Sequence, residues 1–470
     1  MALTAAMARA EIRLPKFFGD NMVLQQQTEC RLWGWSEAGK TVAVTTSWDG
    51  KRYEAQAGSD GRFELRVTTP AAGGPYDITF TEQSPHPSPR TSQLLTNVLI
   101  GEVWVCSGQS NMEMQMKGFK QQPVEGANDV LLDCHDPLLR LFTVKRNPQL
   151  LPQADVSGQW CEAETSSVRD FSATAYFFGR ALRRQLGVPV GLIVTSFGGS
   201  ACEAWMKADW LRDFQKVTIP SGEDDVNRLQ QRCPTALYNG QLHPLVGYAM
   251  RGVIWYQGED NVPRYDYYAQ LLARMAEGWR EEWQQGDFPF YYCQIAPYDY
   301  SLIDWGGSQY LREQQMKAEA RIGNARMAVL MDAGLEYGIH PRKKRQAGER
   351  LAILALAHTY NIKGLPEFAS YKGVEFQGDT AVVSFDRSKE WIYFENGPHS
   401  QNFEIAGEDH VFHPAQAWVS RNRVYVRSTA VPHPVAVRYA FRDWAVGDLM
   451  HDGLPVSSFR TDNWPPSSTR

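Results

Sequence analysis

Apolar and polar residues alternate in short runs over the first part of the chain. Such runs occupy residues 22–25, 30–35, 41–45, 62–67 and 76–80, and Gly-containing turns at 49–50, 60–61 and 73–75 separate them. Alternation with a period of two, interrupted by turns, is typical of antiparallel sheets that pack face to face. The pattern predicts a β-sandwich-like domain over residues 11–95, and the Pro- and Ser-rich residues 84–90 predict a loop or linker within it.

The pattern changes between residues 96 and 365, where continuous apolar runs alternate with stretches of helical period. Helices are predicted over residues 174–186, 265–283, 311–322 and 342–360. Strands that alternate with helices form a largely parallel sheet that is covered on both faces. We therefore expect an α/β domain with three layers, α/β/α, over residues 96–365.

Short strand-like runs return between residues 366 and 470, for example at 373–376, 380–385 and 434–441. They predict a second, C-terminal β-sandwich-like region. This region could border a substrate cleft or bind carbohydrate, but structural support of the central domain is the simpler interpretation.

The most informative strand of the central domain ends directly before a serine. Residues 98–105 are rich in strand-forming side chains, residues 107–109 form a polar turn, and Ser110 follows. A nucleophilic serine needs this placement, on a tight turn between a strand and a helix. A serine after a strand can also be a simple cap or turn residue. Ser110 is therefore a candidate nucleophile only if the chain also provides a general base for it.

His340 is the candidate partner. It follows a predicted strand at residues 327–331 and precedes Pro341, which suits the first position of a helix. A histidine held on a rigid loop can act as a general base towards a serine. The alternative interpretation is a histidine that only caps the helix.

Two further strand ends carry groups that can stabilise a negatively charged oxygen. Gly198 and Gly199 follow the apolar run 190–196, and glycines allow backbone N–H groups to approach a ligand oxygen closely. Gln257 follows the run 252–256 and carries a side-chain amide that can donate to the same oxygen. In a parallel sheet these strand ends lie at one edge, where ligands bind.

Several segments together resemble the sialate O-acetylesterase family, which belongs to the SGNH (GDSL-like) hydrolases. The resemblance runs from about residue 15 to residue 461 and rests on the segments 108–112 (Gly-Gln-Ser-Asn-Met), 197–200 (Phe-Gly-Gly-Ser), 203–206 (Glu-Ala-Trp-Met), 237–240 (Leu-Tyr-Asn-Gly), 243–244 (His-Pro), 252–259 (Gly-Val-Ile-Trp-Tyr-Gln-Gly-Glu) and 339–341 (Ile-His-Pro). It implies an SGNH-type central domain with Ser110 as the nucleophile and His340 as the general base. The N–H groups of Ser110 and Gly199 and the side chain of Gln257 would form the oxyanion hole.

The chain departs from the family at the third member of the catalytic triad. An acid is expected two or three residues before the histidine, where this chain has Gly338 and Tyr337. Either a backbone carbonyl orients the imidazole of a Ser–His pair, or an acid arrives from elsewhere; Asp332 and Glu336 are near but have unusual spacing. We favour the Ser–His pair.

The resemblance implies a serine esterase that removes O-acetyl groups from sugars, with 9-O-acetylated sialic acid as the expected substrate. An acetylxylan-type or other glycan deacetylase, and a carbohydrate-binding protein that has lost catalysis, are the alternatives. Glu203 and Glu259 could also be taken for a glycosidase pair, but structural roles are expected for them and for His243.

Composition excludes other classes of function. The net charge of −5 and the lack of nucleic-acid-binding motifs argue against a nucleic-acid partner, and no apolar run is long enough to span a membrane. Seven scattered cysteines without a Cys-x-x-Cys motif indicate neither a disulfide scaffold nor a metal site, and no cofactor is expected. The basic residues 342–345 are interpreted as a solvated helix face.

The first ten residues carry no basic segment, but residues 8–10 (Ala-Arg-Ala) fit a signal-peptidase cleavage pattern. The resemblance implies an exported bacterial enzyme, periplasmic or secreted. The oligomeric state is not predicted.

Overall fold

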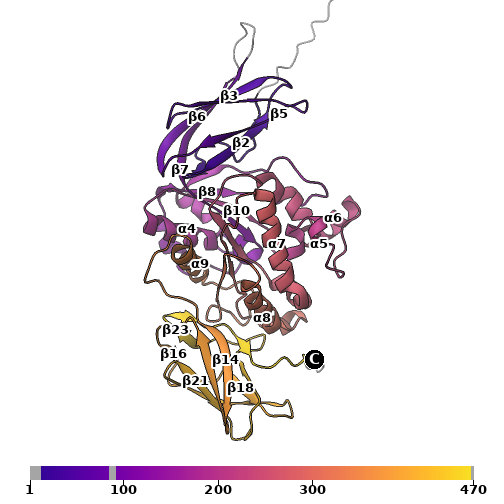
Figure 1. Ribbon diagram of the computed structural model, residues 1–470, viewed down its shortest axis with the longest axis vertical. Coiled ribbons are helices and arrows are strands. Elements are labelled where there is room, and N and C mark those ends of the chain that lie inside the picture. Colours follow the sequence, from indigo (N-terminus) through magenta and orange to yellow (C-terminus); the bar gives the residue numbers. More distant parts are fainter. Residues whose placement is uncertain (1–11, 84–91, 467–470) are drawn as a thin grey trace, which may run out of the picture.

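The computed structural model describes residues 12–83 and 92–466 of the chain. Three regions follow one another along its long axis: an N-terminal β region, a central α/β region and a C-terminal β region (Figure 1). The predicted linker at residues 84–90 and the first ten residues lie outside the described part. The described residues include no helix that is long and apolar enough to cross a membrane.

The N-terminal region is built from short strands, as the alternation predicts. Phe63 and Phe80, from opposite sheets, meet with ring centroids 6.3 Å apart. The strands are β1 (Val23–Gln25), β2 (Glu29–Trp35), β3 (Thr41–Thr46), β4 (Arg52–Gln56), β5 (Arg62–Thr68) and β6 (Gly73–Gln83).

One long strand, β7 (Ser92–Gly108), joins this region to the centre. Its first half pairs with β6, and its second half pairs in parallel with β10 (Val190–Ser196) and β11 (Gly252–Tyr256). The strand therefore crosses the boundary near residue 95, and the division of the chain into domains stays a prediction.

The central sheet has the strand order β13-β12-β11-β7-β10-β8-β9 and is parallel except for β9, which is antiparallel to β8. Its remaining strands are β8 (Asp136–Thr143), β9 (Trp160–Ala163), β12 (Phe290–Cys293) and β13 (Ala325–Ala328). The main helices are α4 (Ala173–Leu186), α7 (Tyr268–Trp283), α8 (Ser308–Glu319) and α9 (Lys344–His358); shorter ones are α1 (Ser110–Glu113), α2 (Ala127–Leu132), α3 (Thr165–Arg169), α5 (Ala208–Leu211) and α6 (Glu223–Leu229).

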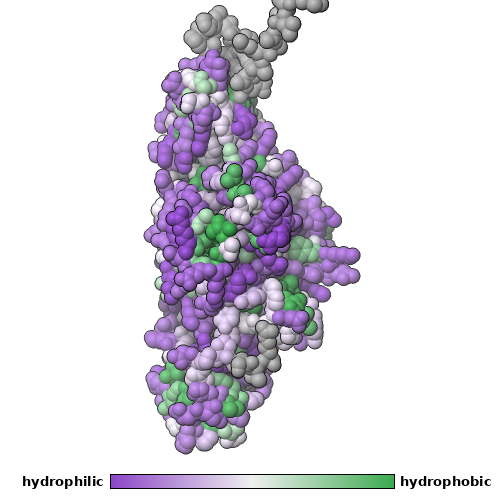
Figure 2. All heavy atoms as spheres, turned by 90° about the vertical axis from the view of Figure 1, so that its right-hand side faces the viewer, coloured by the Kyte–Doolittle hydropathy of each residue, from purple (hydrophilic) through white to green (hydrophobic). Residues whose placement is uncertain are grey.

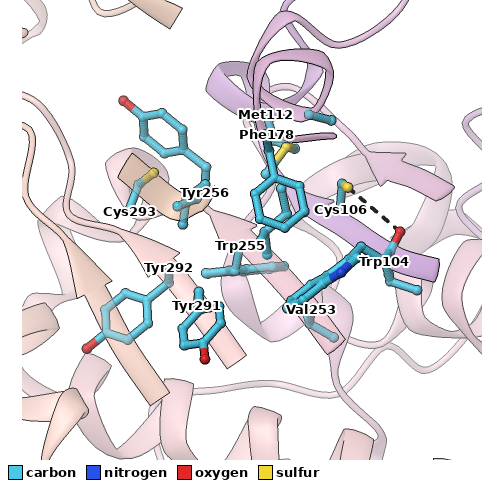
Figure 3. Packing of buried hydrophobic residues seen from close by; sticks show 14 of the residues in the cluster. Trp104, Cys106, Met112, Phe178, Val253, Trp255, Tyr256, Tyr291, Tyr292 and Cys293 are labelled. Atoms are coloured by element: carbon cyan, nitrogen blue, oxygen red, sulfur yellow. Dashed lines mark hydrogen bonds between the residues drawn. The ribbon is translucent and has the colours of Figure 1, made fainter. Parts of the chain in front are cut away.

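Strand register explains why helices cover both faces of this sheet. Trp104 of β7 points to one face, where it meets Phe178 of α4 edge-on and stacks on Tyr291 of β12 (Figure 3). Trp255 of β11 pairs with Ser107, an odd number of residues from Trp104, so it points to the other face and meets Trp279 of α7. The three-layer α/β/α arrangement predicted from the sequence is confirmed.

The C-terminal region consists of antiparallel sheets that pack through aromatic residues, for example Tyr371 stacked on Phe459 at 4.8 Å. Its strands are β14 (Ser370–Gln377), β15 (Thr380–Asp386), β16 (Ile392–Phe394), β17 (His399–Ser400), β18 (Phe403–Ala406), β19 (Phe412–Pro414), β20 (Gln416–Ser420), β21 (Arg423–Arg427), β22 (Ala436–Tyr439), β23 (Leu449–His451), β24 (Leu454–Pro455) and β25 (Phe459–Arg460). Buried Arg312 of α8 donates to the carbonyl of Arg442 at 2.5 Å and to Ser458 at 3.2 Å, which anchors this region on the centre.

The face of the molecule drawn in Figure 2 is largely hydrophilic, with hydrophobic atoms gathered in small patches.

Candidate active site

Ser110 begins the short helix α1, two residues after β7 ends at Gly108. Gly108 has a φ of 138°, and a Cβ atom there would lie 2.1 Å from the carbonyl oxygen of Tyr256 in the neighbouring strand. The N–H of Gln109 donates to that same oxygen at 3.0 Å. A glycine is therefore required at 108 to turn the chain tightly and present Ser110. The N–H of Ser110 lies in the first turn of the helix, where no preceding helical carbonyl can accept it.

The glycine pair follows β10, which lies beside β7 in the sheet. A Cβ atom on Gly198 would lie 3.4 Å from the Cβ of Ser110, so this loop packs directly on the serine. Gly198 donates its N–H to the carboxylate of Glu113 at 2.8 Å. Gly199 has a φ of 72°, and within the described part of the chain its N–H meets no acceptor. That N–H is therefore free for a ligand oxygen.

His340 lies on the loop between β13 and α9, and a turn from elsewhere in the chain holds it. Its Nδ1 is 2.6 Å from Oε1 of Gln122, and its ring meets the ring of Phe119 edge-on at 5.0 Å. Phe119 and Gln122 exchange two backbone hydrogen bonds of 3.0 Å, which make this turn rigid. With Oε1 of Gln122 facing Nδ1, the contact favours the tautomer in which Nδ1 carries the hydrogen and Nε2 keeps its lone pair.

The group that contacts Nδ1 of the imidazole is thus a side-chain carboxamide, whereas the sequence suggested a backbone carbonyl or an acid from elsewhere in the chain. Tyr337, at one of the usual acid positions, is 76% exposed. Gln122 lies 218 residues from His340, and no spacing signal in the sequence connects the two.

The surroundings keep His340 uncharged. Burial, followed by the positive charge of Lys344, lowers the pKa of His340 to about 4. At neutral pH the imidazole is therefore uncharged, and one of its ring nitrogens has a lone pair.

A buried polar cluster links the serine helix to the histidine loop. Asn111 donates to Oε1 of Glu259 at 2.5 Å and to the carbonyl of Ile339 at 3.1 Å, and it accepts from Nζ of Lys344. Burial lowers the pKa of Lys344 to about 7, although the charge of Glu259 opposes the shift. Because Asn111 follows Ser110 and Ile339 precedes His340, this cluster fixes the two reactive residues relative to each other.

Lys344 corrects the prediction of a solvated helix face, because its side chain is buried. The helix also begins later than expected, at Lys344 and not near residue 342. Lys343 has a ψ of 55°, outside the helical region, so Pro341 lies in the irregular segment before the helix and is not the first helical residue.

Ser110, Gly199 and His340 line one cavity of about 520 Å³. Its other lining residues are the apolar Phe119, Ile303, Trp305 and Ile339, the glycine Gly198, and the polar or charged Gln109, Glu113, Arg146, Arg232, Glu259 and Asp260. Both arginines have carboxylate partners, since Arg146 pairs with Glu113 at 2.7 Å and Arg232 with Asp260 at 2.6 Å. Among the described residues Ser110 Oγ and His340 share no hydrogen bond, and in free enzymes such bonds often tighten only when substrate binds.

Gln257 does not line this cavity. Its Nε2 donates to the carbonyl of Ser200 at 3.0 Å and to Asn261 at 2.7 Å, while its Oε1 accepts from Tyr268. The side chain thus ties the end of β11 to the loop that carries Gly199. Its role as an oxyanion donor stays a prediction, and it would require these hydrogens to be released.

The remaining polar candidates have structural contacts. Glu203 accepts from Asn261 at 2.9 Å and from Tyr267 at 2.7 Å, so it has no free carboxylate oxygen directed at the cavity. The Nδ1 of His243 is 2.9 Å from the carbonyl of Gln153, which anchors a loop. Residues 12–83 and 92–466 contain no group of three or more His, Cys, Asp or Glu side chains arranged to hold a metal ion.

Comparison with known proteins agrees with this geometry. A family described as carbohydrate esterase, sialic acid-specific acetylesterase, matches residues 100–353, more than half of the chain. The chain therefore belongs to this family of carbohydrate esterases. It is a carboxylic ester hydrolase, and its family acts on acetylated sugars.

The chain is similar to the sialate O-acetylesterases of Rattus norvegicus, with 26% identity, and of Homo sapiens, with 27% identity; the matches cover 75% of this chain and 74% and 72% of those proteins. Among solved structures, it resembles a carbohydrate acetylesterase from Xanthomonas citri with a TM-score of 0.86 and 34% identity. That match covers 96% of this chain and all of the other.

Proposed function

We propose that the protein is a serine esterase that removes O-acetyl groups from sugars through an acetyl-enzyme, with 9-O-acetylated sialic acid as its substrate. One observation carries the proposal: Ser110, Gly199 and His340 follow three different strands and line one cavity, and Gln122 contacts Nδ1 of the imidazole at 2.6 Å.

The first half of the reaction transfers the acetyl group to the enzyme. Nε2 of His340 takes the proton of the Ser110 hydroxyl as Oγ attacks the acetyl carbonyl carbon. The N–H groups of Ser110 and Gly199 donate to the developing oxyanion. When the tetrahedral intermediate collapses, the bond between the carbonyl carbon and the sugar oxygen breaks, and the imidazolium returns its proton to that oxygen.

The second half releases acetate. Water gives a proton to Nε2 and attacks the acetyl-enzyme, and collapse of this second intermediate restores the Ser110 hydroxyl. Throughout, the Gln122 carbonyl accepts from Nδ1–H, so the imidazole keeps its orientation in both half-reactions.

Two observations bear on the sugar. Arg146 and Arg232 line the cavity and could pair with the carboxylate of a sialic acid, which supports the substrate proposed. Each already has a protein carboxylate as a partner, which favours a second candidate, a deacetylase of neutral glycans such as acetylated xylan. Location in the periplasm or outside the cell is proposed from the family resemblance alone.

Acetate release tests the proposal. The wild type, Ser110→Ala and His340→Ala are assayed on 9-O-acetylated sialic acid, acetylated xylan and p-nitrophenyl acetate, with the exposed Ser166→Ala and His135→Ala as matched controls. We expect the first two variants to lose at least about 10³-fold in rate and the controls to keep wild-type activity. Acetate release from xylan but not from 9-O-acetylated sialic acid would show that the natural substrate is a neutral acetylated glycan, and it would leave the proposed mechanism unchanged. A wild type that is inert on all three esters would favour the carbohydrate-binding alternative.

A further inference from the structure

A second cavity lies next to the active-site cavity, and the two share one lining residue. Trp305 lines both, and it follows the helical turn η6 (Tyr300–Ile303) in the loop after β12. This loop leaves the sheet at the same edge as the loops of Ser110 and Gly199. The second cavity has a volume of about 720 Å³, within the range of ligand sites.

The C-terminal region contributes to this cavity. Asp443 lines it, and the Asp443 carboxylate accepts from the N–H of Ser308 at 2.7 Å and of Gly307 at 3.1 Å, at the start of α8. Figure 1 shows α8 beside the C-terminal strands. The C-terminal region therefore fixes one wall of the cavity.

Aromatic rings form a large part of the lining. Tyr265 and Tyr310 stack with centroids 5.1 Å apart and an interplanar angle of 21°, and Phe441 supports Tyr310 edge-on at 5.2 Å. Burial raises the pKa of both Tyr265 and Tyr310, so the phenols stay neutral. Sugars present C–H faces that pack on aromatic rings. The faces that Tyr265 and Tyr310 turn to each other are occupied, so such packing would use the other face of Tyr265 or the ring of Trp305.

Polar groups of the lining suit hydroxyls and do not suit anions. Gln309 brings a side-chain amide to the lining, and the Oε1 atom of this amide is itself buried. Ser301 and the backbone at Gly306 also line the cavity. The lining residues include Asp304 and Asp443 but no Lys, Arg or His, which favours a neutral chain over an anionic one; the guanidinium of Arg460 lies 5.1 Å from the Tyr310 ring.

We propose that this second cavity, between the loop of Trp305 and the C-terminal region, is a subsite for neutral sugar units linked to the acetylated sugar. The proposal rests on the esterase function proposed above and extends it from a single sugar to an oligosaccharide. It gives the C-terminal region a part in substrate binding.

Chain-length dependence tests the subsite. We compare kcat/KM for two sets of substrates with kcat/KM for p-nitrophenyl acetate. The first set is 9-O-acetylated sialic acid alone and linked to one to three neutral sugars, and the second is acetylated xylo-, cello- and manno-oligosaccharides of one to four units. In the wild type we expect the ratio to rise with length for at least one series. Tyr265→Ala should lower the tetrasaccharide ratio by about 5- to 10-fold, because a stacking platform is removed. Tyr393→Ala, an exposed tyrosine of the C-terminal region, is the matched control.

Binding separates this proposal from the esterase proposal. Isothermal titration of Ser110→Ala with the unacetylated tetrasaccharides should show binding that Tyr265→Ala in the same background weakens by a similar factor. Binding without esterase activity in the wild type would overturn the catalytic proposal and keep the subsite. Equal ratios at all lengths in the wild type, or a tetrasaccharide affinity unchanged by Tyr265→Ala, would overturn the subsite.

Discussion

Replacing Gln122 by glutamate should move the acidic limb of the pH–rate profile to higher pH. In the wild type a neutral carboxamide lies 2.6 Å from Nδ1 of His340, and burial together with Lys344 holds the pKa of His340 at about 4. A carboxylate at the same place favours the imidazolium, and an opposite charge at this distance shifts a pKa by about 1–3 units. The midpoint of the limb should therefore rise from about 4 to roughly 5–7.

The acidic limb moves to higher pH because His340 acts as the general base. His340 must be neutral to take the serine proton, so a higher pKa means that activity disappears sooner as the pH falls. Above pH 8 the same carboxylate stabilises the imidazolium formed in the transition state. Each unit of pKa corresponds to about 1.4 kcal/mol, so kcat at alkaline pH should equal or exceed that of the wild type.

Gln122→Leu is the matched control, because it keeps the size of the side chain and removes the acceptor. Its acidic limb should stay at low pH. Its kcat should fall by about 5- to 100-fold, since losing a buried hydrogen bond costs about 1–3 kcal/mol.

The assay is kcat and kcat/KM for p-nitrophenyl acetate from about pH 3 to pH 9, with circular dichroism at each pH to confirm that the variants stay folded. A Gln122→Glu profile that coincides with the wild type would refute the orienting role of Gln122.

Three further substitutions test the architecture of the site. Asn111→Ala should lower the free energy of unfolding by on the order of 3 kcal/mol and reduce kcat, because the buried Glu259 and Lys344 lose their partner; chemical denaturation that shows a loss below about 1 kcal/mol would contradict this. Gly108→Ala should lower the free energy of unfolding by about 2–4 kcal/mol, because residue 108 has a positive φ and the added Cβ clashes with the Tyr256 carbonyl. A wild-type melting temperature in this variant would contradict the tight turn described before Ser110. Arg312→Met should lower the free energy of unfolding by about 2–4 kcal/mol, because it leaves buried acceptors in the C-terminal region unpaired. The kcat for p-nitrophenyl acetate should stay near the wild-type value, and a large loss of kcat would show that Arg312 also affects the catalytic centre.

Much of the fold could be predicted because periodicity reports local environment. The period of two marked the short strands of the terminal β regions, and apolar runs between helical stretches marked the parallel sheet. The strand ends that carry Ser110 and Gly199 followed from the same pattern, since parallel strands bring their carboxyl ends to one edge. Strand β4 was missed because its sequence has little apolar character: its residues alternate between exposed and half-buried, and none of them is buried.

The tertiary structure decided which side chains meet across the loops. Gln122 contacts His340 over a separation of 218 residues, Lys344 is buried inside a basic run, and the amide of Gln257 is directed at protein acceptors. Local sequence reports whether a segment is a strand, a helix or a loop, and which residues share a face. It does not report where a loop side chain ends up, because that depends on how distant elements pack. The sequence by itself therefore determined the sheet, the edge at which its parallel strands end and the candidate serine and histidine. Only the packed structure decided which side chain contacts the histidine and which groups line the cavity.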